Sequence, residues 1–112
     1  MMFYDFEAGG KNYRLRLTTR SIVSLEKQLN CNPLAIFGDG NTIPTVSTMV
    51  NVLFHSAQQY NHNVSLNDAY DIFDAYLDEG HTMTDFIGVI LEVYKVSGLI
   101  KDSTVAENTE KN

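Results

Sequence analysis

The chain has 112 residues, of which 44% are hydrophobic and 20% are charged, and its formal net charge is −6. This length and composition fit one globular domain, and the acidic balance argues against a nucleic-acid-binding surface, which needs clustered Lys and Arg. We find no apolar run long enough to span a membrane and no signal-peptide pattern, so we expect no membrane partner. The single cysteine, Cys31, excludes an internal disulfide bond, which fits a protein of the reducing cytoplasm.

Two segments of alternating polar and apolar residues predict a β-hairpin over residues 2–17. They are joined by a Gly-Gly dipeptide at positions 9 and 10, which readily adopts the positive φ angles of a two-residue hairpin turn. In the second segment Tyr13, Leu15 and Leu17 share one face. Because an isolated hairpin is marginally stable in water, we expect this face to pack on helices.

Two helices are predicted next, at residues 19–30 and 33–37. The first has an apolar stripe at three- and four-residue spacing, and the hydroxyl of Thr18 or Thr19 can cap its start. An Asn-Pro dipeptide then begins the short helix, since Asn is a favoured cap and Pro a favoured first helical residue.

Three longer amphipathic helices follow, at residues 45–60, 65–79 and 83–97. The middle one begins with a capping box, formed by Ser65 and by Asp68 in place of the usual Glu. The candidate caps of the other two are Thr45 or Ser47 and Thr82 or Thr84. The residues expected to form the buried stripe of the middle helix are Leu66, Ala69, Tyr70, Phe73, Tyr76 and Leu77.

Together these elements predict an α+β fold that is mainly α, with an N-terminal β-hairpin followed by a compact bundle of four main helices and one short helix. Residues 1–100 are expected to form a single globular domain. Residues 101–112 contain almost no apolar side chains, so we expect them to form a disordered, flexible C-terminal tail.

Acidic residues recur along the 65–79 helix at a spacing that places them on one face. They are Asp68, Asp71, Asp74 and Asp78. Such a row can bind a cation or a basic partner, although a solvated helix face is the commoner explanation. We predict that this row, with Met49 and Leu53 of the 45–60 helix, contributes to a partner-binding surface, in which an apolar groove takes helical segments of the partner.

Basic residues form a modest cluster at the other end of the sequence, consisting of Arg14, Arg16, Arg20 and Lys27. Solvated strand and helix faces explain such a cluster most simply. Paired with the acidic helix, however, it makes the molecule electrically two-ended. Complementary patches of this kind favour head-to-tail self-association.

The sequence shows no pattern of catalysis or cofactor binding. His55, His62 and His81 are not spaced as metal ligands, and Cys31 has no CxxC partner. No acid-base pair, nucleophile elbow or phosphate-binding loop is recognisable. We therefore expect no catalytic residues, no metal, no cofactor and no enzymatic activity.

The arrangement resembles the tail assembly chaperones of long-tailed bacteriophages (siphophages) and of related prophages in Gram-positive bacteria. The residues that carry the resemblance are FEAGGKNYRLRLTTRSIVSLEKQLNCNPLAIF, the helix start at Pro44, and NHNVSLNDAYDIFDAYLDEG through LEVYKVSGL. The resemblance implies a non-enzymatic assembly factor of the host cytoplasm. Such a factor binds the tape measure protein, and in some cases the tail tube protein, and is absent from the mature virion.

These chaperones are often made in a short and a long form through a programmed translational frameshift. The chain ends in Glu110-Lys111-Asn112, and Lys-Asn is encoded by the slippery sequences A-AAA-AAC and A-AAA-AAT. We therefore predict such a sequence in the gene. Lys and Asn are also common in flexible tails.

Two other functions fit the same pattern. The chain could be a structural tail or connector component of the virion, which would be found in purified particles. It could also be a small adaptor domain of the host, whose gene would lie away from phage-tail genes.

Overall fold

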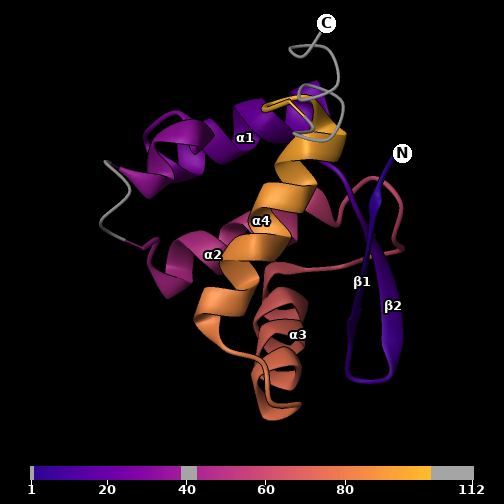
Figure 1. Cartoon of the computed structure of the whole chain (residues 1–112). Coiled ribbons are helices and arrows are strands. Elements are labelled where there is room, and N and C mark those ends of the chain that lie inside the picture. The colour runs from indigo at the N-terminus through magenta and orange to yellow at the C-terminus, as the bar shows by residue number, and fades with distance from the viewer. Residues whose placement is uncertain (1, 39–42, 102–112) are drawn as a thin grey trace, which may run out of the picture.

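The computed structural model describes residues 2–38 and 43–101. Figure 1 shows a two-stranded antiparallel hairpin beside a bundle of helices. In chain order the elements are β1 (Tyr4–Ala8), β2 (Lys11–Leu15), α1 (Thr19–Leu29), the 3-10 helix η1 (Pro33–Phe37), α2 (Val46–Ser56), α3 (Leu66–Asp78) and α4 (Met83–Ser97). The predicted α+β, mainly α fold is confirmed. The predicted tail lies, from residue 102 onward, outside the described residues.

The hairpin turn is formed by Gly9 and Gly10, whose φ angles are 61° and 76°. Tyr4 pairs with Leu15 and Ala8 with Lys11, so the two strands are in the register that a two-residue turn requires. The inner face of the hairpin, with Phe6 and Leu15 buried, packs mainly through β1 on α3 and α4.

Each α-helix begins at a hydroxyl cap. The side chains of Thr18, Thr45 and Thr82 accept hydrogen bonds from the N–H groups of Ser21, Thr48 and Asp85, respectively. Where the sequence left two caps open, the structure selects the earlier one. The predicted capping box of α3 is present, and α4 has a second one, in which Asp85 accepts a hydrogen bond from the Thr82 N–H.

Helix α2 is shorter than the predicted helix at 45–60 because side chains take over its last hydrogen bonds. The amide of Gln58 donates to the carbonyl oxygens of Phe54 and Val64, and the amide of Asn61 donates to that of Ala57. These bonds turn the chain out of the helix after Ser56 and toward α3.

Asn61 also closes the outer edge of β2. Its Oδ1 accepts from the Arg14 N–H at 3.1 Å, and its Nδ2 donates to the Arg14 carbonyl at 2.7 Å. The Arg16 N–H donates to the Ser56 carbonyl at 2.8 Å. The segment that follows α2 therefore takes the place of a neighbouring strand.

The core is centred on α2, which packs against α1, α3 and α4. An aromatic cluster joins the hairpin to this core, because the Phe6 ring lies 5.1 Å from Tyr76 of α3 and 5.8 Å from Phe86 of α4. Toward the other end of α4, the buried Tyr94 hydroxyl donates to the Pro33 carbonyl at 2.8 Å. This bond fixes η1 against α4.

Candidate protein-binding surface

The predicted acidic row is present on α3. Asp68, Asp71, Asp74 and Asp78 are all exposed, on the side of the helix opposite the buried Ala69, Ile72, Phe73 and Tyr76. A row of carboxylates is thus available to a partner along the length of this helix.

Asp68 also serves the helix itself. Its Oδ2 accepts from the Ser65 N–H at 2.9 Å, and the Ser65 Oγ accepts from the Asp68 N–H at 3.0 Å. The hydrogen bonds from Ser65 lower the pKa of the Asp68 carboxyl group because they stabilise its charged form. This residue is therefore part of the helix cap as well as of the acidic row.

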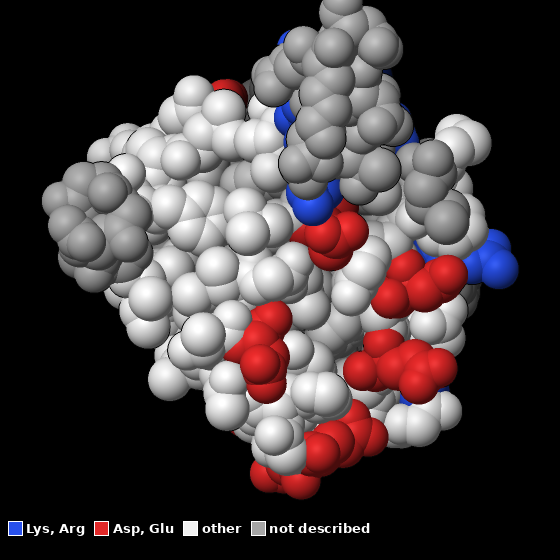
Figure 2. Space-filling view, in the orientation of Figure 1, with Lys and Arg blue, Asp and Glu red and all other residues white. Residues whose placement is uncertain are grey.

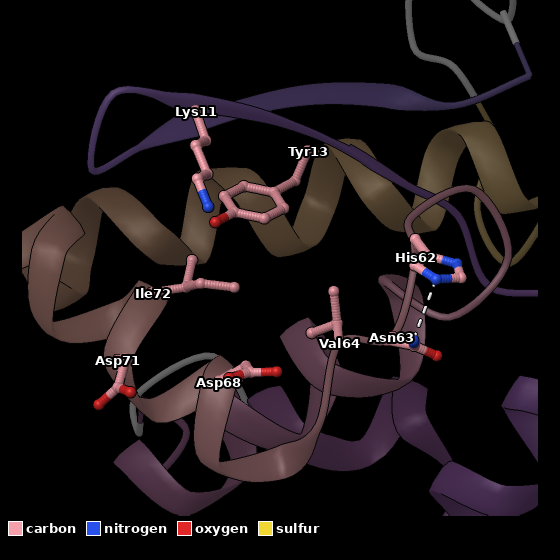
Figure 3. A pocket seen from close by; sticks show the side chains of 8 residues that line it. All are labelled: Lys11, Tyr13, His62, Asn63, Val64, Asp68, Asp71 and Ile72. Carbon is pink, nitrogen blue, oxygen red and sulfur yellow. Dashed lines mark hydrogen bonds between the residues drawn. The ribbon is translucent and has the colours of Figure 1, made fainter.

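A hollow lies between the hairpin and the first half of α3 (Figure 3). Its volume is about 320 Å³, and its lining residues are Lys11, Tyr13, His62, Asn63, Val64, Asp68, Asp71 and Ile72. Figure 3 shows Val64 and Ile72 at the centre of the hollow and the polar side chains around it. This volume is at the lower end of the range for binding pockets. The hollow is large enough for an apolar side chain of a partner.

Both signs of charge meet at this hollow. The Lys11 ammonium group contributes to the lowered pKa of Asp68. Burial raises the pKa of the Tyr13 phenol, and the Asp68 carboxylate adds to this increase. The hollow therefore offers an apolar floor, two carboxylates and one ammonium group, which suit an amphipathic segment better than a single charged ion.

The apolar stripe of α3 differs from the predicted one. Leu66 and Tyr70 were expected to be buried, but their exposed fractions are 38% and 43%, whereas Ile72, which was not in the predicted stripe, is 7% exposed. The cause is that α3 packs against both α2 and β1, and these neighbours select a face rotated from the one the spacing suggested. As a result, exposed apolar side chains accompany the acidic row.

Met49 and Leu53 do not belong to this surface. Their exposed fractions are 0% and 1%, because α2 is covered by three other helices. The prediction that they contact a partner is wrong for this structure, and they are core residues. The sequence could not distinguish an apolar groove from a filled core, since the same spacing produces both.

The predicted basic cluster is partly used within the fold. The Arg16 Nη1 donates to the carbonyl oxygens of Met2 and Val96, and the Arg14 guanidinium lies 4.9 Å from the centre of the Phe3 ring. Arg20 and Lys27 are exposed on α1. In the view of Figure 2 the carboxylates gather mainly over the lower half of the molecule, and head-to-tail self-association stays a prediction.

Potential metal ligands, the single cysteine and the lengths of the helices are further features of the described part of the chain. Across residues 2–38 and 43–101, no three His, Cys, Asp or Glu side chains are grouped so that they could hold a metal ion. Cys31 is exposed. None of the helices described is long and apolar enough to cross a membrane.

The fold and this surface define a small α+β domain with an exposed acidic helix beside an apolar hollow. The chain belongs to the family described as a family of unknown function (DUF6096), which matches residues 5–112. No curated protein and no solved structure matches the chain. The resemblance to tail assembly chaperones therefore stays a prediction from the sequence.

Proposed function

We propose that this protein is a non-enzymatic tail assembly chaperone, which binds a phage tape measure protein in the host cytoplasm during tail tube assembly and is absent from the mature virion. The observation that carries the proposal is the hollow bordered by Asp68 and Asp71. Leu66 and Tyr70 are exposed on a different side of the same helix and add apolar area there. An apolar hollow beside carboxylates fits an amphipathic helical segment with basic residues. The sequence resemblance supplies the class of partner.

The negative net charge supports the same proposal. A protein that holds an aggregation-prone partner needs apolar contact area and enough charge to keep the complex dispersed. The surface of α3 supplies apolar contact area, and the formal charge of −6 supplies the repulsion that keeps the complex dispersed. The tail tube protein is a second candidate partner of the same surface.

The test is co-expression with the tape-measure-like protein encoded beside this chain. We expect the partner to become soluble and to co-purify with the chain in a constant ratio. A partner that stays insoluble, or elutes alone, would contradict the proposal. Detection of the chain in purified particles would instead identify a structural virion component, and a gene without phage-tail neighbours would favour the host adaptor.

A charge-reversal variant tests the surface itself. Asp71→Lys reverses a charge at the hollow without touching the helix cap, and it should reduce the co-purified partner on the order of tenfold. Glu26→Lys makes the same charge change on exposed α1 and should leave the yield unchanged. Equal yields from the two variants would exclude the hollow as the binding site.

A further inference from the structure

The two edges of the hairpin differ in their hydrogen bonding. In an antiparallel pair, residues alternate between those that bond across the pair and those whose N–H and C=O groups point outward. Because Ala8 and Lys11 close the two-residue turn, the outward-pointing residues of β1 are Asp5 and Glu7, and those of β2 are Asn12 and Arg14. On β2, Asn61 bonds both outward groups of Arg14. Ser56 accepts from the Arg16 N–H directly after the strand, so this edge is closed at its C-terminal half.

The edge of β1 is open. Within residues 2–38 and 43–101, the backbone groups of Asp5 and Glu7 that point outward make no hydrogen bond. Buried backbone groups without a partner are rare in folded proteins, so these four groups face water. An open row of donors and acceptors is a template for an added strand.

This edge runs beside α4. The Arg16 guanidinium bonds the carbonyl oxygens of both Met2 and Val96, so the start of the hairpin lies near the end of α4. Phe6, further along β1, contacts Phe86 near the start of α4. Strand β1 therefore runs alongside α4, from the end of that helix toward its start.

Carboxylates surround the open edge. Asp5 and Glu7 belong to β1, Glu79 accepts a hydrogen bond from the Gly9 N–H, and Asp85 and Glu92 lie on α4. Figure 2 shows acidic side chains on both sides of an uncharged strip that runs between α4 and the hairpin. Lys95, paired with Glu92 at 3.0 Å, partly offsets this charge.

We propose that the open edge of β1 binds an extended, positively charged segment of a partner protein, which adds to the hairpin as a third, antiparallel strand. Backbone hydrogen bonds to Asp5 and Glu7 hold the segment, and Lys or Arg at every second position pairs with their carboxylates. A second copy of this chain is the weaker candidate, because antiparallel β1 strands would place like charges opposite one another. The inference is independent of the proposed function, since it concerns a different surface.

The test uses the synthetic peptide acetyl-Lys-Val-Lys-Val-Lys-Val-Lys-amide and the amide NMR signals of the chain. Peptide binding should shift the Asp5 and Glu7 amide signals and slow their exchange with water. The Arg14 amide, already bonded to Asn61, should change little. In antiparallel addition the Lys residues lie opposite Asp5 and Glu7, so N-methylation of the Lys residues removes the bonds to β1. N-methylation of the Val residues affects only the far edge of the peptide.

We therefore expect the N-methyl-Lys peptide to lose binding and the N-methyl-Val peptide to keep it. If the parent peptide fails to shift the β1 signals, or if the N-methyl-Lys peptide binds equally well, the strand-addition proposal is overturned. Equal binding of the N-methyl-Lys peptide would show that charge attraction alone holds the peptide.

Variants provide a second measurement. Glu7→Lys should weaken binding of the parent peptide on the order of tenfold. Glu26→Lys, which makes the same charge change on α1, and Asp71→Lys at the hollow should both bind the peptide like the unsubstituted chain. Equal weakening in all three variants would indicate a response to net charge and would contradict a site at β1.

Discussion

Tyr94 shows how one side chain fixes the position of a whole segment. Its hydroxyl is buried and donates to the carbonyl oxygen of Pro33, and its ring contacts Phe37. Burial raises the pKa of this phenol, so the hydroxyl keeps its proton and remains a hydrogen-bond donor throughout the physiological pH range.

We expect Tyr94→Phe to lower the free energy of unfolding by about 1 kcal/mol, because it removes a buried hydrogen bond that joins η1 to α4. Urea denaturation followed by circular dichroism measures this loss. Tyr70→Phe is the matched control, since the Tyr70 side chain is 43% exposed, and it should change stability little. A Tyr94→Phe variant as stable as the control would mean that the hydrogen bond contributes nothing to folding.

At the scale of the elements, α3 and α4 both begin with a capping box. Ser65 and Asp68 form the capping box of α3, and Thr82 and Asp85 form that of α4. The pKa of Asp68 is lowered in the folded chain by its hydrogen bonds with Ser65. The charged form of Asp68 therefore stabilises the folded state at pH values above the unfolded pKa, and this contribution disappears as the pH falls through the lower, folded pKa.

The prediction concerns Asp68→Asn, which keeps an acceptor oxygen but removes the charge. This variant should be less stable than the unsubstituted chain at neutral pH, and the difference should shrink as the pH falls below the usual pKa of an Asp carboxyl group and through its lowered, folded pKa. Urea denaturation at several pH values measures it. Asp74→Asn removes a charge from the same face without touching the cap and should differ little at any pH. A difference for Asp68→Asn that persists in acid would show that its charge is not the cause.

The starts of elements were predictable from the sequence because their causes are local. The Gly-Gly turn and the caps at Thr18 and Ser65 each involve residues within a few positions of one another. The end of α2 was not predicted, because apolar spacing does not show that the Gln58 and Asn61 side chains bond to carbonyl oxygens at the end of the helix and of Val64. The exposure of Leu66 and the burial of Met49 followed from tertiary packing, which periodicity does not contain.

Only part of the candidate site could be predicted from the sequence. The acidic row on α3 could be predicted because helical spacing fixes which residues share a face. The hollow could not, since Lys11 and Tyr13 come from the hairpin and reach α3 only in the folded chain. The open edge of β1 was equally hidden, because only the structure shows which hairpin edge is covered.

At the scale of the whole molecule, Arg16 joins the beginning of the fold to its end. Its guanidinium bonds Met2 and Val96, and the neighbouring Leu17 N–H donates to the Ser97 Oγ at 2.8 Å. These contacts connect residues 80 positions apart. The hairpin and α4 should therefore unfold together in one cooperative transition.

We expect Arg16→Ala to lower the free energy of unfolding by about 2 kcal/mol, since hydrogen bonds to a charged group are stronger than neutral ones. For a domain of this size the midpoint of thermal unfolding should fall by roughly 10 °C. Arg20→Ala, an exposed Arg on α1, is the control and should leave the midpoint nearly unchanged. Two separate transitions in Arg16→Ala would show that the hairpin and the helices are coupled mainly through this residue, whereas a midpoint equal to that of the control would contradict the role of Arg16.

The closure of β2 by Asn61 also limits the stoichiometry of any assembly built on this hairpin. A two-stranded sheet with both edges open could extend in two directions and grow without end, as fibrils do. Here Asn61 and Ser56 occupy the backbone groups of Arg14 and Arg16. A strand cannot pair along the whole edge of β2, so growth proceeds from β1. Each molecule can accept one additional strand, and even two molecules joined through β1 would form a finished four-stranded sheet rather than the start of a filament.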